Sequence, residues 1–286
     1  MSDFIQLLIT PFIFPFMQKA IITAIVTGTV CAILSCFLIL KGWSLMGDAI
    51  SHAVLPGAII GFVINIPLSI GAFLSGIFCA FAIGYLKENS RIKEDTIIGI
   101  VFSGMFAFGL VLFARIDTDQ HLIHILFGNI LGITNTELKQ TLIISGFTIV
   151  TILLKQKDFI LYCFDVNQAK VIGLPIKIFH YGLLSLLALT IVASLQAVGI
   201  ILVIAMLISP GIIAFTLCKN FNIMLIIAII SSITSSLIGT ILSFHFDAAT
   251  GPCIVLTQAV YFIIALLYNY ISKIKNYFLK NFKFSS

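Results

Sequence analysis

The chain has 286 residues, of which 60% are hydrophobic and only 9% are charged. Soluble domains carry roughly 25% charged residues, and a mean hydropathy of +1.18 excludes that class. The composition predicts an all-α polytopic membrane protein with 8–9 transmembrane helices. The net charge of +5 does not indicate nucleic-acid binding, because the basic residues gather between apolar runs, as the positive-inside rule predicts.

The apolar segments follow one another along the whole chain, which predicts a single transmembrane domain over 1–286. Nine segments fit best, with bounds good to a few residues: 18–40, 47–65, 67–86, 95–114, 138–154, 179–196, 198–217, 221–243 and 250–271. An eight-span count, in which one short segment is merged or dropped, stays open. We expect 1–16 to lie at the membrane interface, 17–271 to form the helical bundle and 272–286 to form a basic cytoplasmic tail.

With nine spans, the lysine-rich segments 87–95, 155–178 and 272–286 fall on one side of the membrane. The positive-inside rule assigns that side to the cytoplasm and therefore places the N-terminus outside. The six cysteines are scattered and form no C-x-x-C pair, so we expect small buried hydrophobic side chains rather than disulfides or a zinc site.

The stretch GDAISHAVLPG carries the most informative pair of residues, Asp48 and His52. At positions i and i+4 they share one face of a helix, and ionisable groups at membrane depth are costly enough to suggest function. Carboxylate oxygen and imidazole nitrogen suit Mn²⁺, Fe²⁺ and Zn²⁺. The alternative is a buried hydrogen bond that only joins two helices.

Three further residues in this stretch predict irregular backbone at the site. Pro56 has no N–H, so the carbonyl of His52 loses its helical partner and could serve as an oxygen ligand. Gly47 and Gly57 bracket the pair and permit a helix break.

A second segment, 196–221, runs into Ser209, Pro210 and Gly211, and Pro with Gly predicts a break. The chain would then resume as a short apolar helix containing Phe215, on the inferred cytoplasmic side, where it could dock a soluble partner. An ordinary proline kink is an equal alternative.

Two polar groups lie in segments expected to be external. Asp117, Asp119, His121 and His124 form one group, and His245 with Asp247 forms the other. Either could be a secondary metal site at an entrance, but solvated polar clusters explain both at least as well.

No G-x-x-x-x-G-K-[ST] phosphate loop, H-E-x-x-H motif or nucleophile set is present in the sequence. We therefore expect a transport subunit rather than an enzyme, with any ATP hydrolysis on a separate chain and no permanently bound cofactor.

Five motifs together resemble the manganese/zinc/iron permeases of ABC importers, most closely those of the Yfe and Sit type. They are GWSLMGDAISHAVLPG, EDTIIGIVFSG, FDVNQAKVIGLP, VGIILVIAMLISPG and FDAATG, and the likeness covers about 17–270. It implies a type II importer of the bacterial inner membrane: two permeases (two copies or a copy and a paralogue), two cytoplasmic ATPases and an extracytoplasmic metal-binding protein.

The resemblance also implies roles for particular residues. Asp48 and His52 match the metal-coordinating Asp and His of the family's GDxxSH motif, and about 199–220 matches its ATPase-coupling segment. The cargo would be Mn²⁺ or Fe²⁺, with Zn²⁺ possible. A proton-coupled secondary carrier and a non-transporting scaffold are the alternatives.

Overall fold

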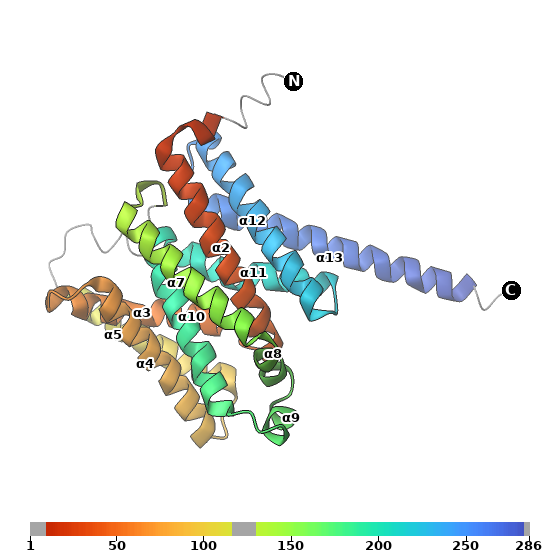
Figure 1. Cartoon of the computed structure of the whole chain (residues 1–286), viewed down its shortest axis with the longest axis horizontal. Helices are drawn as coiled ribbons and strands as arrows, with labels where there is room; N and C mark the ends of the chain where they lie inside the picture. The colour runs from red at the N-terminus through yellow and green to blue at the C-terminus, as the bar shows by residue number, and fades with distance from the viewer. Residues whose placement is uncertain (1–9, 116–129, 283–286) are drawn as a thin grey trace.

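The computed structural model describes residues 10–115 and 130–282, and within these ranges it is a bundle of α-helices (Figure 1). Nine of the described helices are long and apolar enough to cross a membrane, which confirms the nine-span count. In chain order they are α2 (Pro15–Lys41), α3 (Met46–Val63), α4 (Leu68–Asn89), α5 (Glu94–Phe113), α7 (Asn135–Leu154), α10 (Ile176–Val198), α11 (Ile200–Leu217), α12 (Phe221–Phe246) and α13 (Thr250–Phe282). A 3₁₀ turn, η1 (Ile130–Gly132), precedes α7.

Helices α2 and α3 form the interior of the bundle. Helix α2 lies beside α11 and α12, and α3 packs on α4 and α5. Helices α5, α7 and α13 bury only a small part of their surfaces, and α13 extends away from the other helices toward the C-terminus (Figure 1). The candidate site on α3 is therefore held between inner helices and the largely exposed α5.

Helices α3 and α4 approach closely because Gly57 of α3 and Gly71 of α4 meet where the helices cross. A Cβ atom at Gly57 would collide with the carbonyl of Gly71 and with the Cβ atom of Ser75. The Ser75 hydroxyl donates a hydrogen bond of 2.6 Å to the carbonyl of Ala53. This short contact fixes the depth and rotation of the site helix relative to α4.

The predicted helix breaks are wrong. Helix α3 runs without interruption through Pro56 and Gly57, with Gly47 in its first turn, packed on Leu207. Pro56 leaves the carbonyl of His52 without its helical donor, and the hydroxyl of Ser75 bonds the next carbonyl, that of Ala53. The two glycines serve close packing rather than irregular backbone.

Helix α11 is likewise continuous through Pro210, so no separate short helix begins after it. The Ser35 hydroxyl of α2 accepts a hydrogen bond from the N–H of Gly211 (3.0 Å) and lies 3.2 Å from the carbonyl of Ile208, to which it can donate. This side chain supplies partners to the backbone beside the proline. The chain instead turns at Gly199 (φ 81°), between α10 and α11.

Two of the lysine-rich segments, 87–95 and 155–178, lie at the same end of the bundle, where Nζ of Lys41 is 4.1 Å from the ring centroid of Tyr162 (Figure 1). This end, hereafter the basic end, is the one that the positive-inside rule assigns to the cytoplasm. The lysine-rich segment 155–178 contains two short helices, α8 (Gln156–Phe164) and α9 (Val166–Val171). Helix α13 continues to Phe282, into the region predicted as a basic cytoplasmic tail, and the cytoplasmic position of that tail stays a prediction.

All six cysteines are free, and four of them are buried, as expected for small apolar side chains. Burial raises the pKa of the Cys163 thiol in α8 to about 12, so this group is a neutral thiol at physiological pH.

Candidate functional site

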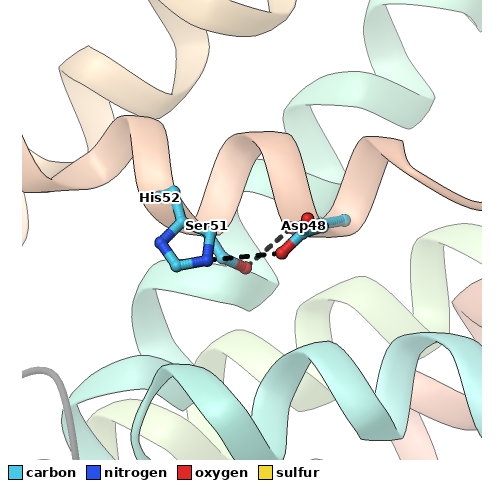
Figure 2. Close-up of polar contacts among 4 residues, drawn as sticks. Asp48, Ser51 and His52 are labelled. Carbon is cyan, nitrogen blue, oxygen red and sulfur yellow. Dashed lines mark hydrogen bonds and ion pairs between the residues drawn. The ribbon is translucent and has the colours of Figure 1, made fainter. Parts of the chain in front are cut away.

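The first two turns of α3 bring Asp48 and His52 together. Figure 2 shows the two side chains on the same face, with Nε2 of His52 3.3 Å from Oδ1 of Asp48. Asp48 lies in the first turn of the helix, where the positive end of the helix dipole favours a carboxylate. Ser51, between them, is buried, and its hydroxyl donates to the carbonyl of Gly47 at 2.7 Å. The i, i+4 spacing therefore yields the predicted pair, and Ser51 belongs to the backbone of α3 rather than to that pair.

The imidazole of His52 is in contact with two phenylalanine rings of α5. Its centroid lies 5.4 Å from that of Phe102 and 5.1 Å from that of Phe106, the latter in an edge arrangement. Nδ1 of His52 is buried and has no hydrogen-bond partner among the described residues. The imidazole of His52 therefore has a polar contact with Asp48 and aromatic contacts with Phe102 and Phe106.

The pair is neither sealed inside the chain nor sufficient as a metal site. The side chains of Asp48 and His52 are 35% and 26% exposed. No group of three or more His, Cys, Asp or Glu side chains able to hold a metal ion exists in the described part of the chain. One copy thus offers two ligand side chains on a face that is partly open.

Of the other two predicted polar groups, only His245 and Asp247 fall in the described part of the chain. The cluster of Asp117, Asp119, His121 and His124 lies outside the described residues. Nδ1 of His245 lies 2.9 Å from the carbonyl of Ile241 in its own helix, to which it can donate. Asp247 caps the C-terminus of α12 with a positive φ of 49°. The proposed role of these two residues at an entrance stays a prediction.

The predicted coupling segment is largely buried. Pro210 and Gly211 pack against α2, where a Cβ atom at Gly211 would lie 2.6 Å from Cδ1 of Ile39. Ser209 is half-buried, whereas Phe215 is 58% exposed. In this conformation the proline and glycine make contacts within the chain, and of these four residues Phe215 is the exposed one with a large side chain.

Sequence reasoning missed the aromatic neighbours of the site and the serines beside the two prolines. Phe102 and Phe106 are spaced i, i+4, which places them on one helix face. That spacing was a usable signal, but it does not say which helix the face meets.

Comparison with known proteins agrees with this architecture. The model of the ABC 3 transport family matches residues 13–269, and the chain belongs to that family. It is 70% identical over 276 residues to the chelated iron transport system membrane protein YfeD of Yersinia pestis, covering 96% of this chain and 93% of that protein. It is 52% identical over 260 residues to the manganese transport system membrane protein MntB of a Synechocystis strain, covering 91% and 85%.

Among solved structures, the chain is similar to PsaBC from Streptococcus pneumoniae in complex with Fab. The TM-score is 0.79 with 41% identity, over 88% of this chain and 91% of that one. Membership of the family and the nine apolar helices identify a multi-pass protein of the bacterial inner membrane with an ABC importer permease fold.

Proposed function

We propose that the chain is the permease subunit of an ATP-driven importer for Mn²⁺ or Fe²⁺, with Zn²⁺ a possible cargo, and that Asp48 and His52 bind the ion in transit. Relatives named for iron and for manganese transport support the cargo class. The observation that carries the site is the 3.3 Å approach of a carboxylate and an imidazole, both partly exposed, on a membrane helix. An Asp–His pair does not by itself select among these metals.

The chemistry of the pair suits passage rather than storage. An ionised Asp48 supplies an anionic oxygen, and a neutral His52 supplies a nitrogen lone pair once its ring turns or exchanges the Asp48 contact for the ion. Two protein ligands leave the remaining coordination positions to water or to a second chain. A site of this kind binds weakly enough to release the ion, which transport requires.

A second permease subunit would complete the site. A carboxylate facing hydrocarbon is costly, so the exposed face of Asp48 calls for a protein or water neighbour. Helix α5, beside it, is mostly exposed, and Cβ atoms added at Gly99 or Gly104 would meet nothing within 4 Å. Small residues of this kind let membrane helices of two subunits approach closely. We therefore infer that a second copy or a paralogue packs on α5 and places its own Asp–His pair beside Asp48 and His52, at the axis of the permease dimer.

The ATPase subunits would dock at the basic end. Helices α8 and α9 are too short to span the membrane, yet Phe164 and Val171 are 79% and 87% exposed. Exposed apolar side chains on a segment facing water indicate a protein partner. We therefore assign the ATPase contact to the exposed side chains of Phe164, Val171 and Phe215. The predicted contact residues Ser209, Pro210 and Gly211 are left out of it.

Helix α8 contacts the C-terminal end of α2, the helix that precedes α3 in the chain. Nζ of Lys41, at the end of α2, lies 4.1 Å from the ring centroid of Tyr162, and the Tyr162 hydroxyl bonds Nδ1 of His180 at 2.8 Å. Movement imposed on α8 by an ATPase would therefore act on the link that begins the site helix. The extracytoplasmic metal-binding protein would dock at the opposite end, where His245 and Asp247 lie.

Uptake of radioactive manganese and iron into proteoliposomes holding the full importer tests the site. Asp48→Ala and His52→Ala are expected to reduce uptake at least a hundredfold while the protein still inserts and keeps its melting temperature. Asp95→Ala, which removes a carboxylate from the first turn of α5, is the control. Normal uptake by Asp48→Ala would refute the site, and undiminished uptake without ATP would favour a secondary carrier.

Co-purification with the ATPase tests the docking surface. Val171→Glu is expected to abolish co-purification while the permease keeps its melting temperature, because a charge would replace an apolar contact. Leu131→Glu places the same charge near the opposite end of the bundle and is expected to retain the ATPase. Retention by Val171→Glu would show that the ATPase docks elsewhere.

A further inference from the structure

The orientation of His52 depends on an unusual set of neighbours. A metal-binding histidine generally donates its second ring N–H to a carboxylate, a carbonyl or water, which orients the ring and strengthens the ligand. Here Nε2 faces Asp48, whereas Nδ1 is buried without a partner in the described part of the chain. Figure 2 shows Nδ1 pointing away from the carboxylate.

Two phenylalanine rings of α5 lie beside the imidazole of His52. The rings of Phe102 and Phe106 lie 5.4 and 5.1 Å from the imidazole and 6.1 Å from each other. A phenylalanine ring contacts an imidazole by packing and by its quadrupole, but it offers no oxygen or nitrogen to Nδ1. The imidazole is thus confined by packing without being fixed by a second strong hydrogen bond.

The packing of α5 on α3 makes this arrangement specific. A Cβ atom at Gly109 would lie 3.1 Å from Cδ of Pro56 and 3.2 Å from Cδ2 of Leu55, so α5 approaches α3 closely where position 109 lacks a side chain. Phe106, one turn before Gly109, packs against Leu55 and the buried Ile59. The ring beside His52 is therefore anchored on the site helix itself.

We propose that Phe102 and Phe106 are positioning residues that set the strength of the ion site. They hold the His52 ring toward Asp48. Because their side chains have no hydrogen-bonding atoms, they also leave Nδ1 of His52 without the second hydrogen bond that would make His52 a stronger ligand. Metal affinity then stays in the range that permits release. This inference rests on the proposed transport function, because it assigns a consequence to His52 acting as a ligand.

Replacements with opposite expected effects test the proposal. Leucine at 102 or 106 keeps an apolar side chain but removes the ring, so the imidazole loses its orientation and affinity for Mn²⁺ should fall about tenfold. Glutamine offers an oxygen to Nδ1–H, and at one or both positions it should raise affinity by about ten- to a hundredfold, the usual size of such outer contacts. Tighter binding should also slow release and lower the maximal uptake rate.

The measurements are equilibrium binding of radioactive manganese to the full importer in lipid nanodiscs and uptake in proteoliposomes. Phe108→Leu and Phe108→Gln alter an exposed ring of the same helix and are expected to change neither. Phe106→Tyr keeps the ring and should bind manganese within about twofold of the unaltered protein. A purely structural role would lower stability and uptake in leucine and glutamine variants alike.

Two outcomes separate this inference from the proposed function. If Asp48→Ala fails to bind manganese but leucine and glutamine shift affinity in the same direction at both positions, the positioning role is wrong and the transport site stands. If Asp48→Ala binds manganese like the unaltered protein, both the site assignment and the positioning role of Phe102 and Phe106 are wrong.

Discussion

Helices α3 and α11 each contain a proline followed by a glycine, Pro56–Gly57 and Pro210–Gly211, and both remain helical through the pair. In each case the glycine meets a neighbouring helix closely, and a serine hydroxyl from that helix bonds the backbone nearby. The same two-residue signal thus marks a close crossing of membrane helices in two separate places.

Helices α3 and α11 differ in the polar side chains that they carry outside these proline–glycine pairs. Helix α3 presents Asp48 and His52 on a partly open face, whereas α11 has no ionisable residue between Ile200 and Leu217. The proline–glycine pair therefore predicts packing, and only the charged pair distinguishes a candidate site. Variants matched across the two helices test this distinction.

Alanine at the two glycines should produce the largest effects. The Cβ atom of Gly57→Ala would collide first with the backbone carbonyl of Gly71, which cannot move without moving α4. That of Gly211→Ala would first meet the side chains of Ser35 and Ile39, which can turn aside more easily. Overpacking costs about 1–3 kcal/mol, and we expect Gly57→Ala at the top of this range and Gly211→Ala below it. Gly99→Ala, in open space, is the control. Melting temperatures in detergent measure the order, and equal values for all three would contradict it.

Removing the serine hydroxyls should have a smaller effect, and here α11 should be the more sensitive helix. Ser35→Ala removes a hydroxyl that accepts from the buried N–H of Gly211 and can donate to the carbonyl of Ile208, at a cost of about 1–3 kcal/mol. Ser75→Ala removes a donor to the carbonyl of Ala53 and should cost about 1 kcal/mol. Ser103→Ala, on an exposed surface, should melt like the unaltered protein. The reverse order of the first two would show that the contact at α3 is the stronger.

The smallest effect is expected inside the site motif itself. Ser51 bonds the carbonyl of Gly47 in its own helix, so Ser51→Ala should change the free energy of unfolding by about 1 kcal/mol or less. Metal uptake should fall less than threefold, in contrast to Asp48→Ala. Uptake assays on both variants check this, and a loss as large as that of Asp48→Ala would make Ser51 a ligand.

The sequence by itself determined the spans, the all-α fold class and the Asp48–His52 pair. Hydrocarbon has no hydrogen-bond partners for the backbone, so a long apolar run must be helical. Within a helix, residues four apart share a face whatever surrounds them. These conclusions depend on local geometry, and the described structure agrees with them.

Tertiary structure alone decided which helix faces meet. Membrane helices are apolar on nearly all sides, so their residue pattern does not reveal the inner face. The contacts of His52 with Phe106 and of Ser35 with Gly211 join residues far apart in the chain. For the same reason the sequence predicted breaks at Pro56 and Pro210, because the serines beside them come from other helices.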